Sequence, residues 1–259
     1  MGKKIIRVIA VVLIPVVCLY LLTLLLTPKY VNDIPEGSMI AEYYKSEKNN
    51  DVLILGDCEV YENISTVKMW EEYGITSYIR GSSEQLIWQS YYLLEDTLKH
   101  ETPKVVVLSM LAMSEADAKS EAYNRMTLDG MRWSKSKWNS IKESMTEKET
   151  MGSYIFPLLR YHSRWSELSS DDIKYMFNKP KVTSNGYLMQ VGVRPVTTVP
   201  KVSSLANYTF SDRNYEYLDK IKDLCNEKGI KLVLIKAPSI FPHWLSLIHI
   251  SEPPRLQLI

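Results

Sequence analysis

The chain has few cysteines, histidines and phenylalanines: three, four and four among 259 residues. Three cysteines cannot build a disulfide framework, and Cys18, Cys58 and Cys225 lie in separate segments, so no pairing is implied. Because the histidines are scattered and Cys58 has no close ligand partner, the sequence predicts no metal site, and nothing in it indicates a cofactor. The formal net charge is only +1, so bulk electrostatics do not indicate a nucleic-acid partner.

Although phenylalanine is scarce, the other two aromatic residues are plentiful, with seventeen tyrosines and six tryptophans. Such residues suit amphipathic surfaces and clefts that face carbohydrate, but tyrosine is also an ordinary half-buried residue of strands. The length allows one α/β domain with a sizeable core and additional segments.

A hydrophobic run follows a basic N-terminus. Three basic residues occur within the first seven positions, and residues 8–26 carry no charge. A helix over this run would be roughly 28 Å long, close to the hydrocarbon thickness of a bilayer. The basic flank should stay in the cytoplasm, so we expect residues 1–29 to be a single-pass anchor in the cell membrane and the main domain to be extracytoplasmic. A cleaved signal peptide is the alternative, although no small-residue cleavage pattern precedes Pro28.

Residues 30–50 form a polar connector, with a short helix expected at 38–44, that should carry the domain away from the bilayer. An apolar run of β-forming residues follows at 52–55, and Gly56-Asp57 is a turn signal that ends it. Cys58 comes directly after the turn, where a helix is expected to start. A strand, a sharp glycine turn and a reactive side chain make the geometry that holds a nucleophile above a parallel sheet, with free N–H groups nearby.

Strands and helices then alternate along the chain. Strands are expected at 75–79, 105–108 and 231–235, and helices at 65–73, 84–99 and 215–228, with Ser83 as the N-cap of the second helix. Gly74 and Gly229 end two of these helices. The alternation predicts an α/β fold with a doubly wound parallel sheet. Cys225 falls on the inward face of its helix and is expected in the core.

The Gly56-Asp57-Cys58 block resembles the first block of the SGNH/GDSL hydrolase superfamily of esterases and acyltransferases, which is Gly-Asp-Ser after the first strand. Cys58 stands where the family has serine. Much of the chain also resembles a membrane-anchored bacterial branch, akin to proteins that help to D-alanylate lipoteichoic acid or to O-acetylate surface polysaccharides. The resemblance covers about residues 51–239. It implies a flavodoxin-like, SGNH-type sheet within a domain at 51–245, with Cys58 as the nucleophile.

The same resemblance implies an oxyanion hole at the ends of the strands. The second block of the family is a glycine after the second strand, and Gly81 has that place; its N–H and that of Cys58 would hold the oxyanion. The third block would be an asparagine, but Ser109 follows the third strand here, and no asparagine follows it until Asn124. Ser109 could donate a hydrogen bond instead. A glycine at the end of a strand is also common for backbone reasons alone.

Residues 114–200 do not fit a minimal α/β unit, and we expect a helical insertion over the carboxyl edge of the sheet, where α/β proteins bind ligands. Arg160 and Arg164 lie four residues apart on one helix face and, with Asp57, are the candidate substrate contacts. The alternative is that the two arginines pair with nearby acids and fasten the insertion. His162 is expected to pack or to form hydrogen bonds rather than to act as a base.

The last fourteen residues, 246–259, have no hydrophobic period and resemble translated sequencing-adaptor read-through more than the natural end of a gene. We therefore expect a truncated or frameshifted, non-native tail and an incomplete domain at 51–245. The last block of the family, an Asp and a His after a fifth strand, would lie beyond Leu245. Neither His243 nor His249 has an Asp two or three residues before it, so the general base of the family is missing.

Two functions remain open. The first is a membrane-anchored, extracytoplasmic esterase or O-acyltransferase that acts on cell-envelope polymers, with Cys58 attacking an acyl group. The neighbouring acids Asp57, Glu59 and Glu62 should raise the pKa of Cys58, which disfavours an active thiolate. The second is a catalytically inactive surface protein of the same fold that binds an envelope polysaccharide or teichoic acid, or a membrane-bound O-acyltransferase. Cys58 is then a small residue buried in a tight turn.

Overall fold

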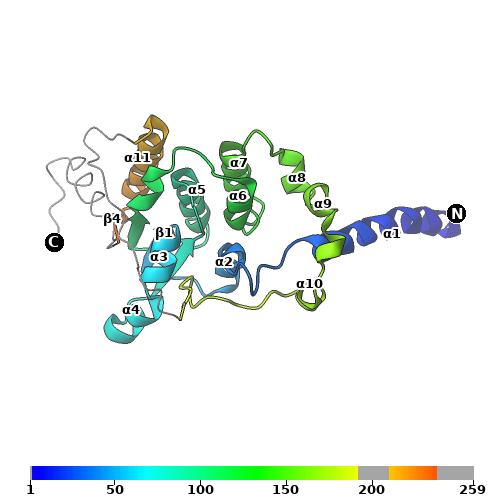
Figure 1. Ribbon diagram of the computed structural model, residues 1–259, viewed down its shortest axis with the longest axis horizontal. Helices are drawn as coiled ribbons and strands as arrows, with labels where there is room; N and C mark the ends of the chain where they lie inside the picture. The colour runs from blue at the N-terminus through cyan, green and yellow to red at the C-terminus, as the bar shows by residue number, and fades with distance from the viewer. Residues whose placement is uncertain (1, 192–209, 238–259) are drawn as a thin grey trace.

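A four-stranded parallel sheet organises the domain, in a computed structural model that describes residues 2–191 and 210–237 (Figure 1). The strands lie in the order β2-β1-β3-β4 and are β1 (Val52–Gly56), β2 (Ser77–Gly81), β3 (Val105–Ser109) and β4 (Lys231–Ile235). All three neighbouring pairs are parallel. The α/β class and the parallel sheet predicted from the sequence are confirmed, although the second strand begins at Ser77, two residues later than expected. The tail at 246–259, which contains His249, lies outside the described residues, and so does His243 before it.

Helices cover both faces of the sheet. They are α3 (Cys58–Asn63) and α4 (Thr66–Tyr73) on one face, and α5 (Ile87–Thr97) and α11 (Asp212–Glu227) on the other. Successive residues of a strand point to opposite faces, so Val52 and Ile54 pack with α3, whereas Leu53 and Leu55 pack with α5. This arrangement is the doubly wound one that the alternation of elements predicts.

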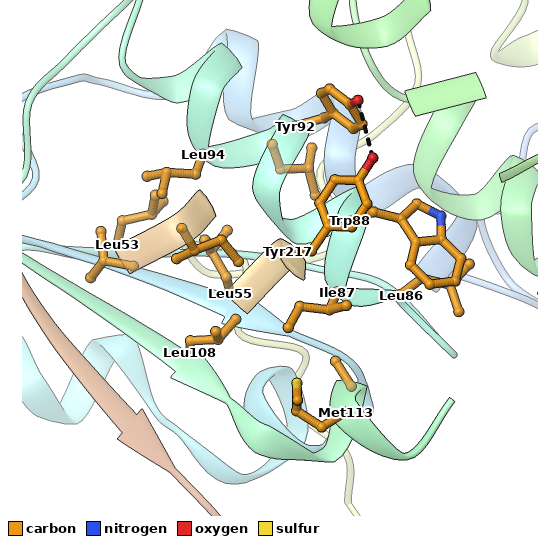
Figure 2. Close-up of a cluster of buried hydrophobic side chains, with 14 of the residues drawn as sticks. Leu53, Leu55, Leu86, Ile87, Trp88, Tyr92, Leu94, Leu108, Met113 and Tyr217 are labelled. Atoms are coloured by element: carbon orange, nitrogen blue, oxygen red, sulfur yellow. Dashed lines mark hydrogen bonds between the residues drawn. The ribbon is translucent and has the colours of Figure 1, made fainter. Parts of the chain in front are cut away.

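The larger core cluster lies between the sheet, α5 and α11. Figure 2 shows Leu55 and Leu108 below Tyr92, with Leu53 to their left, and the hydroxyl oxygens of Tyr92 and Tyr217 lie 3.3 Å apart. Cys225 is fully buried in this cluster, as the helical pattern predicts. Buried apolar side chains of this size contribute about 1.5–3 kcal/mol each, so this cluster fixes the position of α5 and α11 on the sheet.

Two helix ends illustrate what local sequence can predict. Gly74 adopts a φ of 66° and ends α4, as expected for a glycine in the left-handed conformation. The start of α5 was predicted wrongly. Ser83 is not its N-cap, because Glu84 has a φ of 54° and the helix begins only at Ile87. There the Gln89 side chain accepts a hydrogen bond from the Leu86 N–H at 3.1 Å, which satisfies a free donor at the helix start.

The segment expected to be a connector is part of the folded domain. It forms α2 (Glu36–Glu42) and η1 (Tyr43–Lys45), and Met39, Ile40 and Tyr43 are buried. Helix α2 contacts β2 and the first helix of the insertion. The prediction of a spacer is therefore corrected, because the apolar residues of this segment complete the core.

The insertion is helical, as predicted. Its elements are η2 (Met110–Ser114), α6 (Glu121–Leu128), α7 (Lys135–Ser144), α8 (Met151–Ile155), α9 (Leu158–Tyr161), η3 (Arg164–Glu167) and α10 (Ser170–Lys174). Its helices pack mainly on α5 and α2, and Figure 1 shows α7 beside α5. The chain then returns along β2, where the Ile79 N–H donates to the Asn185 carbonyl at 3.0 Å. Residues 192–200, the end of the expected insertion, lie outside the described residues.

Helix α1 (Gly2–Leu26) covers the hydrophobic run and extends from the domain (Figure 1). Its C-terminal end contacts α9 and α10. Among the helices of the described residues, none has both the length and the apolar character that crossing a membrane requires.

Candidate functional site at the carboxyl edge of the sheet

The residues of the Gly56-Asp57-Cys58 block lie at the carboxyl ends of the strands. Gly56 is the last residue of β1 and pairs with Gly81, the last residue of β2. Asp57 is the N-cap of α3, and Cys58 is the first residue of that helix. The strand, turn and helix predicted around Cys58 therefore form, and they bring Cys58 and Gly81 to the same edge of the sheet. Ser109 ends β3, the other neighbour of β1.

The two glycines are required by close approach of the backbone. A Cβ atom on Gly81 would lie 2.8 Å from the Gly56 carbonyl oxygen, and a Cβ atom on Gly56 would lie 2.6 Å from the Ser109 Cβ. Gly56 also has a φ of 152°, in the region that favours glycine. The geometry gives Gly81 a structural role, and its expected role in an oxyanion hole stays a prediction.

The thiol of Cys58 lies in an acidic, half-buried environment. Burial raises the pKa of the Cys58 thiol to about 12, and the carboxylates of Asp57, Glu62 and Glu84 add to the rise. With such a pKa, only about one thiol in 10⁵ is ionised at pH 7, and the thiolate is the nucleophilic form. The arrangement therefore opposes activation of Cys58.

The side chain of Asp57 caps α3 and is almost fully buried. Its Oδ1 accepts a hydrogen bond from the Glu59 N–H at 3.0 Å. Burial raises the pKa of this carboxyl to about 6, and the charges of Glu59 and Glu84 act in the same direction. Asp57 therefore caps α3 and directly precedes Cys58 in the sequence. Its role in binding substrate stays a prediction.

Glu59 does not act as the sequence suggested. It was expected to raise the pKa of Cys58, but its carboxylate instead lies between Ser109 and Lys236. It accepts hydrogen bonds from the Ser109 hydroxyl at 2.5 Å and from the Ala237 N–H at 3.1 Å, and it forms an ion pair with the Lys236 ammonium group. Both side chains of that pair are about 6% exposed. One carboxylate therefore joins the carboxyl ends of β1, β3 and β4.

This network occupies the hydroxyl that was expected to complete the oxyanion hole. The Ser109 Oγ donates its one proton to Glu59 and accepts a hydrogen bond from the Leu111 N–H at 3.2 Å. Because a hydroxyl has a single proton, Ser109 in this arrangement has none to give to an oxyanion beside Cys58.

The two arginines of the insertion lie elsewhere. Arg160, on α9, pairs with Glu121 at 3.0 Å, and Arg164, in η3, donates to the Leu26 carbonyl at 2.5 Å and lies 3.4 Å from Asp172. Both elements lie at the α1 end of the domain, away from α3 (Figure 1). These contacts agree with the alternative in which the two arginines pair with acids and fasten the insertion. Their predicted contact with substrate stays a prediction. His162 is exposed, and its Nδ1 lies 3.2 Å from the Leu158 carbonyl oxygen.

Sequence reasoning missed Lys236 and Glu84 as members of this site. Both follow directly on the carboxyl end of a parallel strand, within three residues of β4 and β2 respectively. Ligand-facing residues of α/β sheets collect at that edge, so the position of each after its strand was the available signal. Within the described residues, no group of three His, Cys, Asp or Glu side chains is placed to hold a metal ion.

Comparisons with models of protein families, with curated proteins and with solved structures gave no match for this chain.

Proposed function

We propose that this chain is a non-catalytic, SGNH-like surface protein that binds a component of the cell envelope. The observation that carries the proposal is the environment of Cys58, whose pKa is raised to about 12 by burial and by three carboxylates. A cysteine nucleophile normally has a lowered pKa, supplied by a histidine, a lysine or an arginine. The position that a nucleophile would take is thus held by a protonated thiol.

The buried network of Glu59, Ser109 and Lys236 supports the same proposal. It uses a hydroxyl, a carboxylate and an ammonium group to join three strand ends, and each group has its partners inside the protein. Buried polar groups that satisfy one another's hydrogen bonds stabilise the fold. A catalytic group instead needs a donor, an acceptor or a lone pair that is available to the substrate.

An envelope polysaccharide or a teichoic acid is the ligand that we propose, with a membrane-bound O-acyltransferase as the alternative partner. Four tryptophan side chains are exposed on the described surface, Trp70, Trp133, Trp138 and Trp165. Exposed indole rings offer an apolar face and a hydrogen-bond donor, which suits the binding of sugars. The resemblance of the chain to envelope-modifying proteins points in the same direction.

We further propose that α1 attaches the domain to the cell membrane, with the domain on the extracytoplasmic side. Ile9, Val11, Val12, Leu13, Ile14, Val16, Val17, Leu19, Tyr20 and Leu21 are all exposed along this helix. A continuous apolar surface of this kind marks a contact with membrane or protein. Extraction of membranes with alkaline carbonate should leave the full chain in the pellet, and added protease should reach the domain in cells stripped of their wall. Release by carbonate would contradict firm attachment.

The second candidate is an esterase or O-acyltransferase. One observation favours it: Cys58, Gly81 and Ser109 do lie at one edge of the sheet, as the resemblance implies. Such an enzyme would need a base from outside the described residues.

The ionisation of Cys58 separates the two candidates. We expect alkylation of Cys58 by iodoacetamide at pH 8 to be about a thousandfold slower than that of an ordinary thiol, and to rise about tenfold per pH unit up to at least pH 10. Peptide mapping by mass spectrometry distinguishes Cys58 from Cys18 and Cys225. The Glu84→Gln variant should react faster, because it removes a nearby charge. A rate that is already maximal at pH 7 would contradict the proposal and favour the enzyme.

A further inference from the structure

A cavity of about 480 Å³ lies near the segment that follows α1, where its lining residue Lys179 bonds to the Pro28 carbonyl, and Cys58 is not part of its lining. It is formed by α2 and η1 on one side and by the chain after α10 on the other, and Figure 1 shows that chain running below α2. Its lining includes Lys45, Tyr175, Phe177, Lys179 and Lys181. Its size is within the range of pockets that hold small molecules.

Positive charge exceeds negative charge in the lining of this cavity, which holds three lysines and one carboxylate. Glu42 is the one carboxylate of the lining, and it is occupied, because it accepts hydrogen bonds from the Val182 N–H at 2.6 Å and the Thr183 hydroxyl at 2.6 Å. Among the residues that the structure describes, no carboxylate lies within ion-pair distance of Lys45, Lys179 or Lys181. Three lysines therefore line the cavity with one carboxylate, Glu42, and none of the three is ion-paired with it, so positive charge is in excess.

The protein partners of these lysines are neutral oxygens. Lys45 Nζ donates to the Asn178 Oδ1 at 2.7 Å, and Lys179 Nζ donates to the Pro28 carbonyl at 3.2 Å. An ammonium group has three protons, so each of these two lysines keeps donors for a ligand. Burial lowers the pKa of Lys179 to about 8, and the charges of Lys29 and Lys45 add to the fall while that of Asp129 opposes it. An anion in the cavity would relieve that repulsion.

We propose that this cavity binds a phosphate ester. A phosphate group carries between one and two negative charges with several acceptor oxygens, which matches a cluster of lysines acting as point charges. Tyr175 and Phe177 add aromatic surface for the organic part of the ligand. The ester can come from a lipid headgroup, since the cavity lies near the segment that follows α1, or from a free sugar or polyol phosphate. This proposal does not depend on the function proposed above.

The test uses the full chain in micelles of an uncharged detergent. The free source is probed by calorimetric titration with sn-glycerol 3-phosphate, and the lipid source by native mass spectrometry with phosphatidylglycerol against phosphatidylcholine. The test variant is Lys45→Gln/Lys181→Gln, whose side chains are exposed, so the fold should be retained; the matched control is Lys68→Gln/Lys222→Gln, on the surface of α4 and α11.

We expect saturable binding of at least one probe that weakens about tenfold or more in the test variant and stays unchanged in the control. Lys179→Arg should keep the binding and Lys179→Gln should weaken it, with thermal melting to verify that both variants are folded. Binding of glycerol phosphate identifies a soluble ester, and selective binding of phosphatidylglycerol identifies a lipid. Absence of both, or binding that the lysine pair does not affect, would overturn the proposal.

Discussion

Glu59 and Lys236, 177 residues apart in the sequence, form a buried ion pair at the carboxyl edge of the sheet. The pair connects the first residues of α3 with the end of β4, and Ser109 joins it from β3. Removing one residue of a buried ion pair destabilises the fold strongly, because the remaining charge is left without a partner. Replacing both residues by apolar ones lowers stability much less. The stability of this edge should therefore depend on both residues together.

The first prediction concerns this ion pair. Glu59→Gln should lower the free energy of unfolding by about 3 kcal/mol, because it leaves the Lys236 ammonium group buried without a counter-charge. The double variant Glu59→Gln/Lys236→Met should recover part of that loss, which urea denaturation at pH 7 can measure. Lys231→Met, at an exposed position on the same strand, is the control and should change stability by less than about 0.5 kcal/mol. The single variant Lys236→Met completes the cycle; a double variant whose loss of stability equals the sum of the losses of Glu59→Gln and Lys236→Met would contradict the coupling.

The second prediction concerns Asp57 and pH. The folded-state pKa of Asp57 is about 6, above the ordinary value of about 3.9 in an unfolded chain. Its contribution to stability is therefore fully present below the unfolded pKa and is lost as pH rises through 6. Asp57→Asn keeps an acceptor for the Glu59 N–H and removes the buried charge. We expect the variant to be more stable than the wild type at pH 8 by about 1–3 kcal/mol, and the two to converge near pH 3.5. A difference that is the same at both pH values would show that ionisation of Asp57 is not its cause.

The third prediction concerns the contact between the ends of β1 and β2. Gly81→Ala would place a methyl group 2.8 Å from the Gly56 carbonyl oxygen, and relief of this overlap requires the strands to move apart. We expect a loss of about 1–3 kcal/mol in unfolding free energy. Gly152→Ala is the matched control, because its new methyl group would meet no atom closer than 3.6 Å. Equal stability of the two variants would argue against the close approach.

The regular elements were more predictable from the sequence than the site. The apolar runs at β1, β3 and β4, and the glycine that ends α4, are local signals, and they placed these elements within a residue or two. The late start of α5 was missed, because Glu84 adopts a left-handed turn that no local pattern signals. At the site, the sequence placed Cys58 after its strand and predicted acidic neighbours. It could not show that Glu59 turns to Lys236, since that contact depends on β4 lying beside β3.

The placement of the insertion was also beyond the sequence. Its helical character follows from local patterns, but the surface it covers is decided by packing against α5 and α2. That packing places Arg160 and Arg164 at the α1 end of the domain. Of the basic residues that the structure describes at the Cys58 edge, Lys236 is paired with Glu59 and Lys119 with Glu84.

The most direct test of the central claim, that Cys58 is not an acyl-accepting nucleophile, is the intact mass of the protein after incubation with p-nitrophenyl acetate at pH 7.5. Wild type, Cys58→Ala and Cys58→Ser should each show no acyl adduct that maps to position 58, because a thiol with a pKa of about 12 is almost wholly protonated. The wild type unfolded in urea is the positive control, since its Cys58 pKa returns to the ordinary range. An acyl adduct on the folded wild type that disappears in Cys58→Ala, or turnover restored by Cys58→Ser, would contradict the account and establish an acyl-transfer enzyme.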